Sequence, residues 1–247
     1  MDHFIYIAAS GASEAMFSQA INAHNLANAS TTGFRADLLV AQSAHLSGGG
    51  LESRVFAGVQ NQGIDFREGA INVTGGELDV AVNGQGWLAI LSPDGTEAYS
   101  RRGDMRVNEY GQLMNGAGQQ VLGNSGPIAV PPFTTISIAS DGTISMVPLG
   151  EDPNTLAVVD RIKLVNPDHA LLTKNETGLI QMIDPGSQAE PDASVRLVQG
   201  SLESSNVDSV GAMVRMIEMA RQFETHTKMM ETAEQIDQAS AELMSMN

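Results

Sequence analysis

The stretch DHFIYIAASGASEAMFSQAINAHNLAN, residues 2–28, decides the fold at the start of this chain of 247 residues. It contains no proline, and Gly11 is its only glycine. Mostly small side chains recur in it at alternating steps of three and four residues. This spacing is typical of a helix that packs one narrow face against another helix. The stripe consists of Ile5, Ala8, Ala12, Ala15, Gln19, Asn22 and Leu26.

The same pattern returns in residues 207–246, which also lack proline. Two distant helices with complementary stripes predict a terminal helix pair that packs into a larger bundle. We place Ile217 on the side of the second helix that a bundle must keep dry. The second stripe runs through Met213, Met216, Ala220, Phe223, Thr227 and Met230, and its register then shifts to Ala233, Ile236, Ser240 and Leu243.

The predicted helix pair would bury little apolar surface, because alanine dominates the first stripe and two of its members, Gln19 and Asn22, are polar. Neighbouring copies of the chain could supply the missing area. We therefore expect the terminal helices to fray in an isolated monomer. A helical cap on an ordinary globular domain is the alternative, and periodicity alone leaves it open.

The interior of the chain has the pattern of a β domain. Short alternating apolar runs begin near Leu78 and continue to Val198, and such runs predict strands. Dipeptides that favour tight hairpin turns separate them, for example Asn83-Gly84 and Asp141-Gly142. The sequence therefore predicts an antiparallel sheet with local connections.

We expect an α+β fold in which N- and C-terminal helices form a coiled-coil layer and an antiparallel β domain lies between them. The glycine run at 48–50 favours a flexible connector before the β domain. The predicted parts are the N-terminal helix at 1–33, the connector at 34–75, the β domain at 76–199 and the C-terminal helix at 200–247.

Composition argues against several classes of partner. The formal net charge is -16, and Arg101-Arg102 is the only adjacent basic pair, so we expect no nucleic-acid binding. The absence of cysteine excludes disulfides and thiolate metal sites. No stretch is long and apolar enough to span a bilayer, and the first residues lack the pattern of a secretory signal. We therefore expect no membrane insertion.

No group of residues has the spacing of a catalytic or cofactor site. The five histidines occur singly, without a second histidine or cysteine at ligand spacing. The segment Gly84-Gln85-Gly86 lacks the third glycine of a dinucleotide motif and is better explained as a turn. We expect no cofactor, no metal and no enzyme activity. A secreted β-rich adhesin is a rival hypothesis, but it would leave the terminal stripes without a purpose.

Long motifs at both ends resemble the signatures of bacterial flagellar rod and hook proteins. The N-terminal motif comprises Ala9-Ser10-Gly11-Ala12 and the run NLANASTTGFR at 25–35. The C-terminal motif comprises QGSLESSNVD at 199–208, with MVRMI at 213–217 and RQFE at 221–224 behind it. The interior segments at 76–87 and 99–104 resemble the β domain of the same family. The resemblance covers nearly the whole chain.

Within that family, the opening residues 1–6 and the segment Gly86-Trp87-Leu88-Ala89 are most similar to the proximal rod protein. The distal rod paralogue is similar over the same length and is the alternative. The resemblance implies a structural subunit that stacks helically into a hollow drive shaft, with the terminal helices in an inner coiled-coil layer. It also implies partners: other copies of the chain, other rod proteins, and the flagellar type III export apparatus, which would export it without a cleaved signal peptide.

The two kinds of evidence together predict an assembly interface on the terminal helices. Small side chains would allow close helix approach, and Asn22 and Asn25 would hydrogen bond between subunits. Asn28 is explained by simple helix termination. The predicted interface residues are Ile5, Ala8, Ala12, Ala15, Asn22, Asn25, Leu26, Met213, Ile217, Ala220 and Phe223.

Overall fold

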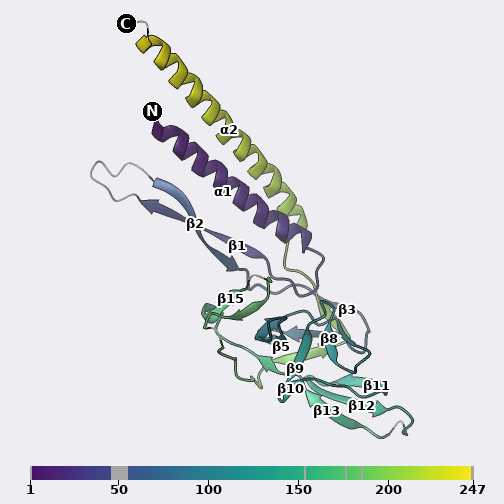
Figure 1. Ribbon diagram of the computed structural model, residues 1–247. Helices are drawn as coiled ribbons and strands as arrows, with labels where there is room; N and C mark the ends of the chain where they lie inside the picture. Colours follow the sequence, from purple (N-terminus) through teal and green to yellow (C-terminus); the bar gives the residue numbers. More distant parts are fainter. Residues whose placement is uncertain (1, 46–54, 153, 176, 185, 246–247) are drawn as a thin grey trace. The chain divides into compact units, whose positions relative to one another are not determined.

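The computed structural model describes residues 2–45, 55–152, 154–175, 177–184 and 186–245 (Figure 1). The chain forms two compact units. The helical unit comprises Met1–Ala29, Ala36–Asp65 and Val207–Asn247, and the β unit comprises Ser30–Arg35 and Phe66–Asn206. The fold is therefore α+β, with a helix at each end of the chain, as the sequence predicts.

The helical unit is built on two long helices, α1 (Asp2–Ala27) and α2 (Ser209–Ser245). They pack along each other in opposite directions, so that the start of α1 and the end of α2 point the same way (Figure 1). A hairpin of β1 (Asp37–His45) and β2 (Val55–Ile64) completes the unit. Its register pairs Asp37 with Ile64, and it shifts between Val40 and Ala41.

Three strands lie in the range that we expected to be a connector: β1, β2 and β3 (Ile71–Val73). The correction has a physical reason. In β2 two glycines and three polar residues interrupt the apolar alternation, so the segment lacks a clear period of two. The glycine run at 48–50, on which the expected connector depended, lies outside the described residues.

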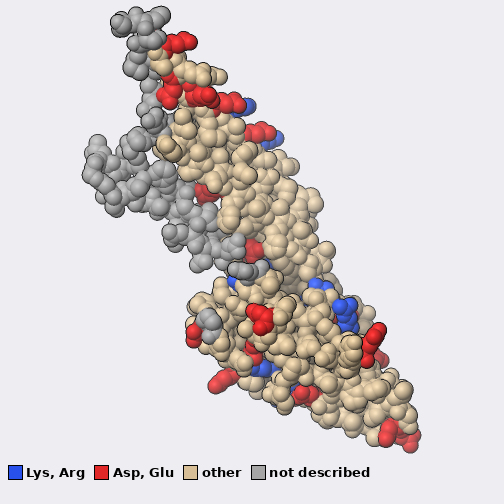
Figure 2. Space-filling model, viewed as in Figure 1, with Lys and Arg blue, Asp and Glu red and all other residues tan. Residues whose placement is uncertain are grey.

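Charge is unevenly spread along α2. Its second half carries the exposed acidic side chains Glu231, Glu234 and Glu242. In the first half, Glu218 and Glu224 are balanced by Arg215 and Arg221. Figure 2 shows red side chains of the helical unit near that end of α2, and a broad uncharged stretch beside it along the helices. The second half of α2 is therefore net acidic, whereas the charges of the first half balance.

The β unit contains only antiparallel pairs among its described strands. Its largest sheet has the order β15-β16-β6-β5-β9-β8-β7, with β10 paired to β9 and β14 to β5. Smaller sheets are β11-β12-β13, β17-β4 and β18-β3. A short 3-10 helix, η1 (His169–Leu171), precedes β15. The strands after β3 are β4 (Val80–Asn83), β5 (Trp87–Leu91), β6 (Glu97–Ser100), β7 (Met105–Val107), β8 (Leu113–Asn115), β9 (Gln120–Gly123), β10 (Gly126–Pro127), β11 (Phe133–Ile138), β12 (Thr143–Pro148), β13 (Ala157–Arg161), β14 (Leu164–Val165), β15 (Leu172–Lys174), β16 (Ile180–Met182), β17 (Arg196–Gln199) and β18 (Ser201–Glu203).

The hairpin turns lie where the sequence predicts them. Gly84 and Gly142 have φ values of 77° and 88°, a left-handed conformation that costs glycine little. The Asp141 carboxylate accepts a hydrogen bond from the Thr143 backbone N–H at 3.1 Å, which closes its turn locally. These short connections explain why neighbours in the chain are often neighbours in the sheets.

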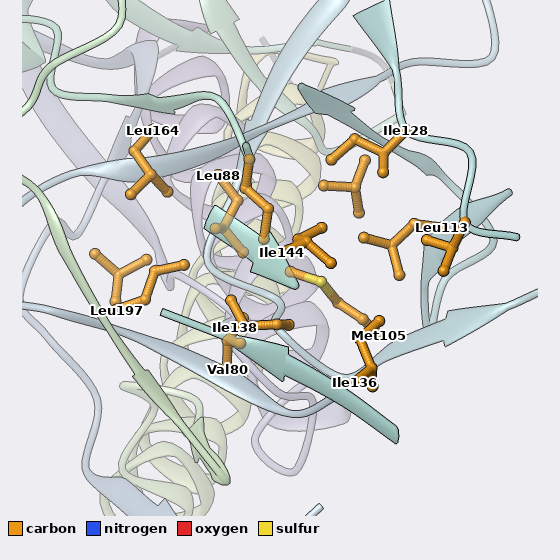
Figure 3. Close-up of a cluster of buried hydrophobic side chains, with 14 of the residues drawn as sticks. Val80, Leu88, Met105, Leu113, Ile128, Ile136, Ile138, Ile144, Leu164 and Leu197 are labelled. Atoms are coloured by element: carbon orange, nitrogen blue, oxygen red, sulfur yellow. The ribbon is translucent and has the colours of Figure 1, made fainter. Parts of the chain in front are cut away.

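One hydrophobic core joins the largest sheet of the β unit to the β11-β12-β13 and β17-β4 sheets. Figure 3 shows side chains from several sheets that point toward one another. Strand β5 lies deep in the unit, because four of its five residues are buried. Labelled members of the core are Val80, Leu88, Met105, Leu113, Ile128, Ile136, Ile138, Ile144, Leu164 and Leu197.

Candidate functional site: the paired terminal helices

The predicted stripe on α1 is a buried face of that helix. Ala8, Ala12 and Ala15 are buried, and Ile5 and Leu26 are half-buried. Alanine side chains let two helix backbones approach closely, and α1 packs along α2. The stripe therefore contributes to packing within one chain.

Two features fix how α1 crosses α2. The Asn22 side-chain amide donates a hydrogen bond to the Ala212 carbonyl at 2.7 Å, and Asn22 is buried. At Gly11, a Cβ atom would lie 2.5 Å from His226 Cε1, so the imidazole fits only because glycine has no side chain. A single buried polar residue in a helix seam specifies register. These contacts define one alignment of the two helices.

The end of α1 is tied to the start of β1. Asn25 makes two bonds to the Asp37 backbone: its Nδ2 donates to the carbonyl at 2.9 Å, and its Oδ1 accepts from the N–H at 2.8 Å. His24 Nδ1 lies 2.8 Å from Asp37 Oδ2. Asn28 Nδ2 donates to the His24 carbonyl at 3.0 Å, as expected for a helix end. Asn22 and Asn25, which we expected to hydrogen bond between subunits, thus both bond within the chain, and their role between subunits stays a prediction.

The predicted residues of α2 divide into two groups. Ala220 and Phe223 are half-buried, in line with the buried Ala212 and Ala233. Met213 and Ile217, in contrast, are 54% and 57% exposed, so they lie away from the contact with α1. The sequence analysis placed Met213 on the face of α2 that packs against α1, but the buried residue is its neighbour Ala212. Both residues are apolar, and periodicity alone does not separate them.

The exposed residues of early α2 form a stripe of their own. Val210 and Val214 are exposed together with Met213 and Ile217. Their spacing of i, i+3, i+4 and i+7 places all four on one side of the helix. We call these four residues the outer stripe. Sequence reasoning included two of them and missed Val210 and Val214, although the spacing was there to be read.

The exposed face of α1 carries large hydrophobic side chains as well. Tyr6, Met16 and Phe17 are exposed, at 65%, 58% and 41%. The small uncharged residues Ala9, Ser13 and Ala20 are exposed on the same face. Clustered exposed apolar side chains mark interaction surfaces more often than scattered ones do. This face of α1 thus lacks the charged residues that usually meet water, whereas α2 carries exposed charges such as Arg215 and Glu218 beside its outer stripe.

The described residues offer little for chemistry. Within them, no three histidine, aspartate or glutamate side chains are grouped so that they could hold a metal ion. The search for a membrane-spanning helix in the same residues found none of sufficient length and apolarity.

Comparisons with known proteins agree with the motifs at the two ends. The family described as "Flagellar basal body rod FlgEFG protein C-terminal" matches residues 198–243, and "Flagellar hook protein FlgE/F/G D1 domain" matches residues 81–146. The chain is 39% identical to the flagellar basal-body rod protein FlgF of Salmonella typhimurium and 38% identical to that of Escherichia coli, over the full length of both chains in each case. It is 30% identical to the rod protein FlgG of Buchnera aphidicola, over 97% of this chain and 98% of the relative.

Proposed function

We propose that this chain, which belongs to the family of flagellar basal-body rod proteins, is a structural subunit that builds the proximal rod from helically stacked copies. Its partners are other copies of itself, neighbouring rod proteins and the flagellar type III export apparatus. The paired helices form the inner coiled-coil layer of a hollow shaft that transmits torque. A place in the distal rod is the weaker alternative, because the 30% identity to FlgG is below the 38–39% identity to FlgF.

The outer stripe is the observation that carries the assembly proposal. The seam residues Ala8, Ala12 and Ala15 are already buried in one chain, so further contacts need another surface. The outer stripe and the exposed face of α1 supply it, because packing them against neighbours removes apolar area from water. A subunit that worked alone would gain nothing from leaving four apolar residues in line on one helix.

The test is Ile217→Asp. Because Ile217 is exposed in the single chain, the variant should change the free energy of unfolding of the purified protein by less than about 0.5 kcal/mol. In the assembled rod the carboxylate would be buried without a partner, at a cost of several kcal/mol. We expect the variant to be exported and folded, and bacteria that depend on it to lack rods and motility.

Gln235→Asp is the matched control. Gln235 is exposed and lies about five helical turns beyond Ile217, on the same side of α2 but in its acidic half. We expect this variant to support swimming. Normal rods and swimming with Ile217→Asp would show that the outer stripe faces solvent in the assembly, and the proposal would then be wrong.

A further inference from the structure

The chain passes between the helical unit and the β unit four times: after residues 29, 35, 65 and 206. On the β-unit side, every passage therefore adjoins one of three short segments, at 30–35, 66–70 and 201–206. We call these the junction segments. Any force that travels along the backbone between the units must run through one of them.

The junction segments are hydrogen bonded to one another. The Gly33 N–H donates to the Glu203 carbonyl at 2.8 Å, which joins the first segment to the third. The Ser204 N–H donates to the Ala70 carbonyl at 2.8 Å, which joins the third segment to the second. All three segments thus meet at the end of β18.

The side chain of Glu203 lies at the centre of this arrangement. Its Oε1 accepts a hydrogen bond from the Gly69 N–H at 2.8 Å and is 2.6 Å from Arg35 Nη2. Its Oε2 accepts from Arg101 Nη1 at 3.0 Å. The side chains of Arg35, Glu203 and Arg101 are 1%, 1% and 4% exposed. One buried carboxylate therefore contacts two junction segments while it belongs to the third.

Arg101 anchors this group in the β unit. Its Nη2 donates to the Gly84 carbonyl at 2.6 Å, at the turn that follows β4. The guanidinium carbons of Arg101 and Arg35 lie 5.3 Å and 5.7 Å from the centre of the Trp87 ring, within the range of cation–π attraction. Burial lowers the pKa of Arg101, whereas the charge of Glu203 raises it. The arginine remains charged, since its guanidinium does not lose its proton in proteins.

Stability alone is a weak explanation for such a group. A buried ion triad is often no more stable than apolar residues of similar size, but removing one partner is strongly destabilising. Without Glu203, Arg35 would be left buried and unsatisfied: its Nε and Nη1 atoms have no hydrogen-bond partner in the described part of the chain. The Glu203 carboxylate belongs to one junction segment and contacts the other two, so its role is better explained as fixing their positions than as adding stability.

We infer that Glu203 is a positioning residue that fastens the three junction segments to each other and, through Arg101, to the body of the β unit. Force that reaches the β unit along any of the four passages then enters it at one rigid point. The contacts described above support this fastening of the segments by Glu203. The further statement that the fastening transmits torque rests on the proposed function.

The fastening is tested on the purified full-length chain with Glu203→Gln. The junction amides Gly33, Gly69 and Ser204 should exchange their hydrogens at least about tenfold faster, because the lost charge loosens all three segments together. Trp87, the only tryptophan, should report the change as a shift in its fluorescence. Glu97→Gln is the matched control: Glu97 forms a part-buried ion pair with Lys163 at 2.7 Å, within the same unit. It should leave the junction amides and Trp87 unchanged.

If the Glu203→Gln protein does not fold, the same exchange measurement is made on Arg35→Lys. It keeps the charge but loses the planar fork of the guanidinium, so the junction amides should still exchange faster. Unchanged junction exchange in a folded Glu203→Gln or Arg35→Lys protein would overturn the fastening. So would equal acceleration in Glu97→Gln, since the effect would then be general loss of stability.

The mechanical part is tested in bacteria that carry each variant as their only copy. With Glu203→Gln or Arg35→Lys we expect assembled flagella whose rotation fails as the viscosity of the medium rises, while Glu97→Gln rotates as the wild type does. Normal rotation at high viscosity, with fast junction exchange, would overturn the torque assignment. If the wild-type chain itself failed to restore motility, the proposed function would be wrong, and the exchange result would be unaffected.

Discussion

Tyr99 shows how one buried hydroxyl links stability to pH. Its side chain is buried, and its oxygen accepts a hydrogen bond from the Ala189 N–H at 2.9 Å. Burial raises the pKa of Tyr99 from 10.0 to about 12, because the phenolate is poorly solvated there. Between these two values the folded chain binds more protons than the unfolded chain, so this contribution to stability falls as pH rises.

We predict that the free energy of unfolding of Tyr99→Phe falls less steeply between pH 10 and pH 12 than that of the wild type. At neutral pH the variant should lose about 1 kcal/mol, because the Ala189 N–H loses its acceptor. Urea unfolding at a series of pH values measures both effects. If the free energy of unfolding fell equally in both proteins between pH 10 and pH 12, Tyr99 would not be the group responsible for the fall.

A second prediction at the residue scale concerns the contact between Gly11 and His226. Alanine at position 11 would gain about 1 kcal/mol of helix propensity, but its Cβ would overlap the imidazole of His226. We expect Gly11→Ala to lower stability by about 1–3 kcal/mol, the usual range for overpacking. Urea unfolding, followed by helical circular dichroism, measures it.

The control is the same substitution in a His226→Ala background. There the overlap is absent, so Gly11→Ala should raise stability by about the propensity difference. The reversal of sign is the signature of direct contact. Equal effects in both backgrounds would mean that position 11 and position 226 do not meet.

At the scale of elements, the features that the sequence predicts are local ones. The hairpin at Asp141-Gly142 was predictable because its turn is closed by neighbours in the chain, and the run at 87–91 corresponds to β5. The helix pair was predictable from its stripes. The seam of α2 was misplaced at Met213, because apolar residues surround that part of the helix and several registers satisfy the same pattern.

The group around Glu203 could not have been found in this way. Arg35, Arg101 and Glu203 are brought together from three distant parts of the chain, and nothing in the local pattern around any of them indicates a buried charge. Their pairing depends on how β18 meets β3, which is a contact of high sequence separation. Single-sequence periodicity carries no information about it.

The β unit extends beyond residues 76–199, and a comparison of fragments tests what the extension does. A fragment of residues 76–199 lacks β3, β18 and Glu203, and it would leave Arg101 buried without its carboxylate. We expect a fragment of residues 66–206 to unfold cooperatively, and the shorter one to melt at least about 6 °C lower. The longer fragment with Glu203→Gln separates the loss of charge from the loss of strands. Equal melting temperatures for all three fragments would contradict the expectation.

At the scale of the whole molecule, assembly brings together copies that each carry a net charge of -16. Repulsion between them should oppose packing through the apolar helix faces. We expect self-association of the purified chain, measured by sedimentation, to strengthen as ionic strength rises from about 0.01 M to 0.15 M, where the screening length falls from about 30 Å to 8 Å.

Neutralising the exposed acids Glu231 and Glu234 to glutamine should weaken this salt dependence. Association that becomes weaker with added salt would be the opposite result. It would indicate that ion pairs between copies, rather than apolar contacts, hold the subunits together.

The pairing of α1 with α2 also dictates the order in which the molecule is completed. Helix α1 ends at Ala27, but its partner begins only at Ser209. Closing so long a loop is slow compared with forming the hairpins of the β unit. A chain that emerges N-terminus first from a ribosome therefore has to be released almost completely before α2 can cover Ala8, Ala12 and Ala15. A chain without α2 cannot form the α1–α2 pair, so only a complete subunit has the paired helices that assembly would use.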